Sequence, residues 1–322
     1  MSAVASPPAS ALDDAAIEWL LQSDEPGIRR QTRRDLLGGD AATDAADVLN
    51  GPWVSALLDG QRDDGGFGVD VYGKWLGAHW RLVSLVELGL PAGEPRAIAA
   101  YETVLAWLLG EGHRRSTRQI RDRWRRCASQ EGNALTVGVR LGLADDPRLA
   151  QLAESLVGWQ WPDGGWNCDT ETSATHSSFN ETATPMGGLG LYAAATADHG
   201  AKRATRRAAD FILDHQVYKS HSSGEVGSPK WLELRYPPYW RYDIVQGMLM
   251  LDRAGALPDR RATDAAAWLR EQQRENGRWQ LIGSPMWKQG GGMYREPARW
   301  ERSGASQMLT LNALRVLRAQ QA

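Results

Sequence analysis

Apolar residues recur at the three- and four-residue spacing of amphipathic helices along most of this 322-residue chain. Short polar stretches that contain glycine separate these segments. Several segments end in glycine, or in glycine followed by proline, as helix C-termini commonly do. No segment shows the strict alternation of a multistranded sheet. The pattern therefore predicts an all-α protein of roughly ten to thirteen helices, most of them paired in hairpins.

The turns between the predicted helices repeat a single form. "QRDDGGF" at Gln61–Phe67, "QWPDGGW" at Gln160–Trp166 and "QRENGRW" at Gln273–Trp279 all read Gln-x-x-Asp/Asn-Gly-x-aromatic. Asp, Asn and Gly suit a tight corner, and the Gln side chain can hydrogen-bond to a neighbouring turn. The aromatic residue can then close over the following helix. The repeated unit predicted here is helix, tight turn, helix.

Residues 1–12 are expected to be a disordered tail, because they hold neither the basic start nor the long apolar core of a signal peptide. Residues 13–322 are expected to form a single domain. No uncharged apolar run reaches about 18 residues, so no membrane-spanning helix is expected. The two cysteines, Cys127 and Cys168, are too few for a disulfide framework and suit a reducing compartment. A cytoplasmic location is therefore predicted.

Charge and aromatic content narrow the choice of partner. The formal net charge is -2 and the pI is about 6.3, so no overall basic field favours nucleic acid, and none is expected as a partner. The basic run His113–Arg126 could attract a diphosphate, a carboxylated substrate or nucleic acid, but a solvated helix face is the default interpretation. The 15 tryptophans against 3 phenylalanines favour a Trp-lined interior, a Trp-lined pocket or both. A small molecule is the expected partner, and the sequence does not indicate an oligomeric state.

The repeated turns resemble the QW repeats of squalene-hopene cyclase and other terpene cyclases, and the glycine-rich turns of protein prenyltransferase β subunits. The resemblance extends from about Trp53 to the C-terminus. It implies an α/α toroid, in which concentric rings of helices surround a cavity lined by inner helix ends and loops. The segment Trp19–Asp40, with "KWLGAHWRL" and "RYPPYWRYD", is also similar to a widespread bacterial group of stand-alone toroid proteins.

The motifs that carry the chemistry of these families are not matched. The Asp-x-Asp-Asp acid of class II terpene cyclases is absent, and "DDAAIE" at Asp13–Glu18 is better explained as a helix N-terminus than as a Mg²⁺ site. The prenyltransferase zinc site uses Asp, Cys and a distant His. Cys168, Asp169 and His176 offer these atoms in a different order and form a weak alternative. No cofactor is therefore predicted, with Mg²⁺ or Zn²⁺ possible but without a matching motif.

Reactive side chains are densest just after the second repeated turn. Asp169, His176 and Glu181 are the candidate catalytic residues, because two carboxylates and a histidine suit acid/base work. The alternative for Glu181 is a capping box with Ser178. Trp166 and Asn167 are expected to contact substrate beside them.

Other candidate substrate contacts lie in three segments. A proline-restrained loop, "LRYPPYWRYD", can display phenols and an indole rigidly, or can pack a helix entry with Asp243 as its N-cap. His79 and Trp80 fall at helical spacing and could face the same cavity. A long glycine-rich segment before the last helix could cover the cavity mouth. The candidates are Tyr236, Tyr239, Trp240, Tyr242 and Asp243 from the first segment, His79 and Trp80 from the second, and Trp287, Tyr294, Arg299 and Trp300 from the third.

Three functional hypotheses follow. The first is a terpene cyclase-like or prenyltransferase-like enzyme that acts on an isoprenoid-type substrate in a Trp- and Tyr-lined cavity by acid/base chemistry. The second is a carbohydrate-active hydrolase or lyase that uses two carboxylates. The third is a ligand-binding toroid without catalysis.

Overall fold

The computed structural model describes residues 9–39, 46–283 and 296–322. Within these residues the chain forms thirteen α-helices and one small antiparallel hairpin, which confirms the all-α prediction. The α-helices are α1 (Ala9–Leu21), α2 (Pro26–Leu37), α3 (Pro52–Leu58), α4 (Ala78–Glu87), α5 (Pro95–Leu109), α6 (Glu111–Arg115), α7 (Ser129–Arg140), α8 (Pro147–Trp159), α9 (Phe179–Thr196), α10 (His199–Asp214), α11 (Ile244–Arg253), α12 (Thr263–Glu271) and α13 (Gln307–Gln321). Short 3-10 helices span Val48–Asn50, Pro229–Leu232 and Arg260–Ala262, and the hairpin pairs β1 (Arg118–Ile120) with β2 (Arg123–Arg125).

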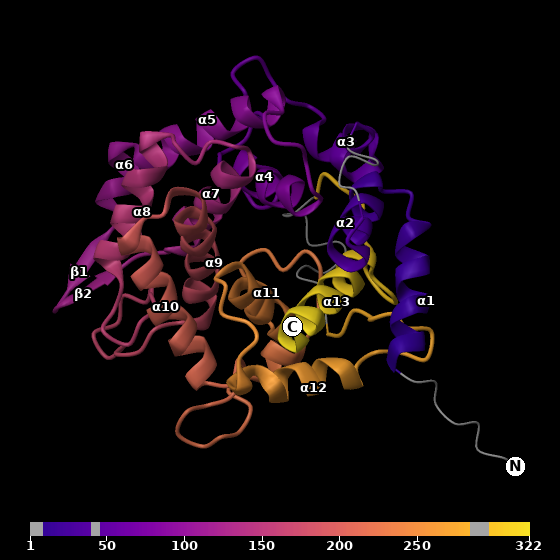
Figure 1. Ribbon diagram of the computed structural model, residues 1–322. Coiled ribbons are helices and arrows are strands. Elements are labelled where there is room, and N and C mark those ends of the chain that lie inside the picture. Colours follow the sequence, from indigo (N-terminus) through magenta and orange to yellow (C-terminus); the bar gives the residue numbers. More distant parts are fainter. Residues whose placement is uncertain (1–8, 40–45, 284–295) are drawn as a thin grey trace, which may run out of the picture.

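The helices form a double ring, as Figure 1 shows. The inner ring consists of α2, α4, α7, α9, α11 and α13, and α1, α3, α5, α8, α10 and α12 lie outside it. The ring closes because α13 packs against both α1 and α2. The predicted α/α toroid is therefore observed. Helix α1 begins at Ala9, inside the stretch predicted to be a tail.

Four of the inner helices run in parallel. Neighbouring pairs among α4, α7, α9 and α11 touch at matching ends. Asn180 near the start of α9 accepts a hydrogen bond from the Tyr242 backbone just before α11, and the Arg140 side chain at the end of α7 donates to the Val86 carbonyl near the end of α4. Helix α2 differs, because Gly27 at its start packs against Leu88, just after α4. The N-terminal ends of α4, α7, α9 and α11 therefore meet at one face of the ring, here called the N-terminal face. Their C-terminal ends meet at the opposite face, the C-terminal face.

The three repeated turns share one set of hydrogen bonds. In each, the Gln side chain donates to the carbonyl oxygen four residues later, at Gly65, Gly164 and Gly277, over 2.7–3.0 Å. The same nitrogen donates to a neighbouring element: the Arg96 carbonyl, the Ala204 carbonyl or the Asp13 carboxylate. Each turn therefore joins one hairpin to the outer helix that follows it around the ring, and the third joins α12 to α1.

The aromatic residue of the turn closes over the preceding helix, not over the following helix as predicted. Indole nitrogens of Trp166 and Trp279 donate to the carbonyl oxygens of Leu156 and Leu269, ten residues earlier, at 2.9 and 2.8 Å. Phe67 has no such donor in the first turn. There the Arg81 guanidinium lies 4.0 Å from the Phe67 ring centroid and donates to Leu57, the equivalent carbonyl, at 2.9 Å. A guanidinium from α4 thus replaces the missing indole donor.

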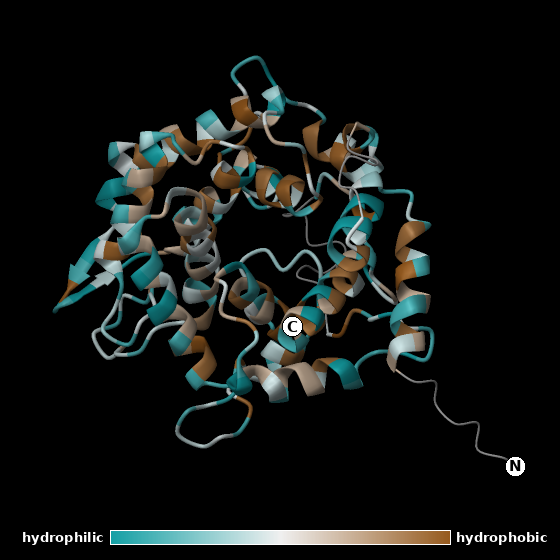
Figure 2. Ribbon diagram, in the orientation of Figure 1, coloured by the Kyte–Doolittle hydropathy of each residue, from teal (hydrophilic) through white to brown (hydrophobic). Residues whose placement is uncertain are grey.

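The basic run does not form the solvated helix face that was its default interpretation. Residues His113–Arg115 end the short helix α6, and the run continues as the hairpin, whose hydrophilic strands project from the ring in Figure 2. Arg125 and Arg126 at its end are buried. Helical spacing fails here because the hairpin packs on α8, with the Arg125 guanidinium 4.4 Å from the Trp161 ring. Among the described residues, no helix has the length and apolar content needed to cross a membrane.

A buried carboxylate, Glu25, links the start of α2 to the start of α3. Its carboxylate is buried before α2 and accepts a hydrogen bond from the Trp53 backbone at the start of α3, at 2.8 Å. Burial raises the pKa of Glu25 from 4.5 to about 7, so the folded chain holds this proton more tightly than the unfolded chain does. Stability from this group is greatest below pH 4.5 and is lost as pH rises through 7.

Glu25→Gln should therefore gain stability relative to the wild type as pH rises. We expect a relative gain of about 2 kcal/mol in the free energy of unfolding between pH 5 and pH 8. Urea denaturation of both proteins at the two pH values measures this gain. An equal stability difference at both values would contradict the assigned titration.

Candidate functional site

Two thiols and a carboxylate come together at the N-terminal face. Cys127 directly precedes α7, Cys168 follows the second repeated turn, and Glu181 lies in the first turn of α9. All three side chains are partly buried, and their Sγ and carboxylate oxygen atoms lie within 4.8 Å of one another. Within residues 9–39, 46–283 and 296–322, no other three His, Cys, Asp or Glu side chains meet in this way.

Backbone pairing holds the two cysteines together. The Arg126 nitrogen donates to the Asn167 carbonyl at 3.1 Å, which places the next residues, Cys127 and Cys168, side by side. On the other side, the Ser178 nitrogen donates to the Trp166 carbonyl at 2.8 Å. The strand-like segment after the second turn is thereby fixed between the end of the hairpin and the start of α9.

Glu181 is oriented by α7. One of its carboxylate oxygens accepts a hydrogen bond from the Ser129 backbone at 3.0 Å, which leaves the other oxygen available to the cysteines. Ser178 makes no side-chain cap bond, so the capping box, the alternative considered for Glu181, does not form. Burial raises the pKa of Glu181. The hydrogen bond between the thiols lowers the pKa of Cys127 and raises that of Cys168.

A buried polar network lies next to the centre. Glu131 on α7 accepts hydrogen bonds from Arg126, at 2.7 and 3.0 Å, and contacts the His113 imidazole at 3.0 Å. Burial raises the pKa of Glu131 to about 7. Burial and the Arg126 charge lower the pKa of His113 to about 3, so this imidazole is neutral at pH 7. The network anchors the hairpin to α7 just before Cys127.

An aromatic wall borders the same centre. Tyr72 stacks on Trp107 with 5.5 Å between ring centroids, and it contacts His79 and Trp80 at 5.2 Å each. Burial raises the pKa of Tyr72, and the charges of Glu181 and both cysteines raise it further, because the phenol faces them. Burial lowers the pKa of His79 to about 3, so its imidazole is also neutral at pH 7.

The other predicted catalytic residues lie outside this centre. Asp169 and His176 are exposed: the Asp169 carboxylate accepts a hydrogen bond from the Glu171 backbone at 2.9 Å, and the His176 carbonyl accepts one from the Asn167 side chain at 2.8 Å. These local turns direct Asp169 outward while Cys168 points inward. The weak metal alternative of Cys168, Asp169 and His176 is therefore wrong, and the structure does not bring Asp169 to Glu181.

The proline-restrained loop mainly packs the structure. Tyr242 donates to the Val217 carbonyl at 2.6 Å, and Asp243 caps α11 by accepting from the Gln246 backbone at 2.8 Å. Tyr239 stacks on Trp75 with ring centroids 3.9 Å apart. Of the remaining predicted contacts, Trp240 is exposed, whereas Trp166 is buried inside its turn and Trp80 is buried in the aromatic wall. Trp300 packs on Trp53 and Tyr236, and the Arg299 carbonyl accepts a hydrogen bond from the Trp53 indole. Trp287 and Tyr294 lie outside the described residues.

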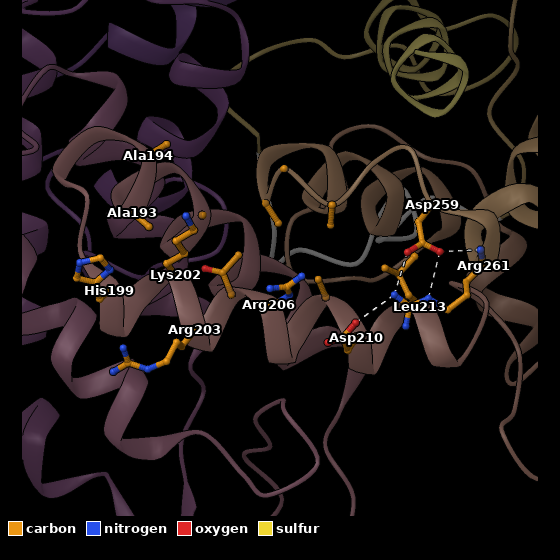
Figure 3. A pocket seen from close by; sticks show the side chains of 16 residues that line it. Ala193, Ala194, His199, Lys202, Arg203, Arg206, Asp210, Leu213, Asp259 and Arg261 are labelled. Carbon is orange, nitrogen blue, oxygen red and sulfur yellow. Dashed lines mark hydrogen bonds and ion pairs between the residues drawn. The ribbon is translucent and has the colours of Figure 1, made fainter.

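The loop before α11 enters the centre of the ring. Tyr236, Pro237, Pro238 and Tyr239 enter it, and together with inner helices α4, α7, α9, α11 and α13 they line a cavity of about 40 Å³. Pockets for drug-sized ligands measure about 300–1,000 Å³. Two larger hollows lie elsewhere, one of about 440 Å³ at the C-terminal face and one of about 710 Å³ between α9, α10 and the segment after α11, shown in Figure 3.

Sequence reasoning missed Cys127 and Tyr72. Cys127 is the only cysteine besides Cys168, and this was the one available signal. The two cysteines come together only because the Arg126 backbone pairs with that of Asn167. Tyr72 lies in a loop with no motif that predicts its direction.

The double ring and its turns define the class of the protein, an α/α toroid. No known family model matches the chain, and no curated protein matches it. Several solved structures do match the chain. A protein from Actinoplanes is 16% identical, with a TM-score of 0.49, over 98% of this chain and 100% of that one. A variant of the type II terpene cyclase MstE from Scytonema, in complex with its substrate geranylgeranyl dihydroxybenzoate, is 16% identical with a TM-score of 0.47, over 96% of each chain. The apo form of MstE gives a TM-score of 0.31.

Proposed function

We propose that this chain is an enzyme that acts on a small molecule at the Cys127–Cys168–Glu181 centre, with Zn²⁺ as cofactor. The observation that carries the proposal is the meeting of two thiols and a carboxylate from three separate segments within 4.8 Å. Thiolate and carboxylate are established zinc ligands, and three protein ligands leave one position for substrate. The donor set and the orienting bond from Ser129 to Glu181 both fit this metal.

Zinc held by these residues would supply a Lewis acid with one open position. The chain's own residues have separate tasks. Ser129 orients the Glu181 carboxylate, and the pairing of Arg126 with Asn167 keeps the thiols adjacent. The raised pKa of Tyr72 keeps its phenol protonated, so that it can donate a hydrogen bond towards a substrate oxygen or anion.

For the substrate class we propose an isoprenoid-type molecule whose apolar part lies on the aromatic wall. Tyr72 and Trp107 are the partly exposed rings of this wall, and their faces suit hydrocarbon or a developing cation. The cavity of about 40 Å³ that the described residues line is too small for such a chain, so we place binding beside Tyr72 at the N-terminal face. A carbohydrate hydrolase has no comparable support, because Asp169 points outward.

Metal analysis tests the proposal. After dialysis against metal-free buffer, the wild type is expected to retain about one zinc per chain, and cobalt substitution should produce a near-ultraviolet thiolate-to-metal absorption band. Cys127→Ser, Cys168→Ser and Glu181→Gln should each lose the metal or weaken its binding by at least about 100-fold, since loss of even an outer-shell partner costs about 10- to 100-fold. Asp169→Asn, on the neighbouring exposed loop, is the matched control and should bind as the wild type does.

Zinc that is absent from the wild type and cannot be loaded, or binding that survives all three variants, would overturn the proposed centre. Mass spectrometry of molecules extracted from the zinc-loaded protein tests the substrate class separately. A retained prenyl compound supports the isoprenoid assignment, and a retained sugar contradicts it.

A further inference from the structure

A basic hollow opens at the C-terminal face of the ring, opposite the Cys127–Cys168–Glu181 centre. Its volume is about 440 Å³, and the ends of α2, α7, α11 and α13 form it. Its charged lining residues are Arg34, Asp35, Arg140, Asp252, Arg253, Arg315 and Arg318. Five guanidinium groups and two carboxylates line this depression, and a third carboxylate, that of Glu87, pairs with Arg253 beside it. Such an excess of cationic charge in a concave site favours an anionic ligand.

Three of these arginines are engaged with protein groups. All three guanidinium nitrogens of Arg315 donate hydrogen bonds, to Asp35, Asn312 and Gln31. Arg34 pairs with Asp35. Arg253 pairs with both oxygens of Glu87, at 2.6 and 2.7 Å. The Nε atom of Arg253 is nevertheless buried without a hydrogen-bond partner. These ion pairs and hydrogen bonds fix the guanidinium groups of Arg315, Arg34 and Arg253 in the absence of a ligand.

The remaining two arginines are only partly used. Arg140 donates through one Nη atom to the Val86 carbonyl at 3.0 Å, and Arg318 donates through one Nη atom to the Leu36 carbonyl. Each holds its guanidinium in place with one nitrogen and leaves the other nitrogens for a ligand in the hollow. Burial lowers the pKa of Arg140 to about 10, and the charges of Arg253, Arg315 and Arg34 act in the same direction. An anion would relieve this repulsion.

We propose that this hollow is an oxyanion-binding site, and that it takes the phosphate or diphosphate group of a small molecule between Arg140 and Arg318. Guanidinium forks match tetrahedral oxyanions by paired N–H···O bonds, which a point charge cannot reproduce. The proposal does not depend on the metal centre, since the two sites occupy opposite faces of the ring.

The larger hollow shown in Figure 3 provides a contrast within the same molecule. Lys202, Arg203 and Arg206 line it from α10, but their side chains are exposed. Arg261 at its far end is occupied by Asp210, Asp214 and Asp259. Its volume of about 710 Å³ is greater. Arg318 is exposed like these cations, but it shares its hollow with the partly buried Arg140, whereas all three cations from α10 are exposed. This hollow is the natural control for binding by charge alone.

Titration calorimetry with inorganic phosphate and pyrophosphate, at constant ionic strength in chloride, tests the proposal. The wild type is expected to bind pyrophosphate more tightly than phosphate. Arg140→Gln/Arg318→Gln should weaken pyrophosphate binding by about tenfold or more. Lys202→Gln/Arg206→Gln removes the same charge from the other hollow and should change binding by less than about twofold. Circular dichroism confirms folding, and Arg318→Gln alone serves if the first double variant does not fold.

Either of two results would overturn the assignment. One is no detectable binding by the wild type at about 10 mM pyrophosphate. The other is an equal loss in both double variants, which would indicate only non-specific attraction of anions.

Discussion

Replacing Gly277 with alanine is expected to lower the free energy of unfolding by about 3–5 kcal/mol. Gly277 has φ +78°, and a Cβ atom there would lie 2.0 Å from the Leu12 carbonyl oxygen of α1. Both atoms belong to backbone, so the contact cannot be relieved by a side-chain rotation. The clash falls where the third turn meets α1, so it should loosen ring closure as well as the turn.

Gly60→Ala is the matched control for this substitution. Gly60 also has positive φ, +71°, but no atom lies within 4 Å of the position of its Cβ. Gly60→Ala should therefore lower the free energy of unfolding by only about 1 kcal/mol, because alanine disfavours the left-handed conformation. Urea denaturation followed by circular dichroism gives both values. Equal losses in the two variants would show that backbone conformation, rather than contact with α1, makes Gly277 necessary.

The second large effect is expected at Arg81. This buried side chain donates to the carbonyl oxygens of Leu57, Asp59 and Leu76 at 2.7–2.9 Å. Arg81→Met should cost about 2–4 kcal/mol, because buried carbonyl groups lose their donors. In a Phe67→Trp background the loss should be smaller by about 1 kcal/mol, because the new indole can donate to Leu57 as Trp166 does to Leu156.

Four proteins complete this comparison: the wild type, the two single variants and the double variant. Phe67→Trp alone is expected to be destabilised by about 1–2 kcal/mol, since the larger ring meets the guanidinium stacked on it. Urea denaturation of each gives the coupling energy. Additive losses would mean that Arg81 does not replace the indole donor of the other two turns.

The sequence by itself determined the helices, their pairing and the three turns. These features depend on residues within a few positions of each other: helical spacing of apolar residues, and Gln, Gly and aromatic residues at fixed offsets. The same turn residues also bind the next outer helix, so local corners carry information about the ring. The resemblance to cyclase and prenyltransferase turns implied the toroid for this reason.

The tertiary structure alone decided which polar groups meet. Cys127 joins Cys168 and Glu181 only because the hairpin pairs with the segment after the second turn and α7 packs on α9. The five arginines of the C-terminal face come from four helices and approach one another only when the ring closes. Distances between residues far apart in sequence depend on the packing of whole helices, so no spacing within the chain could indicate them.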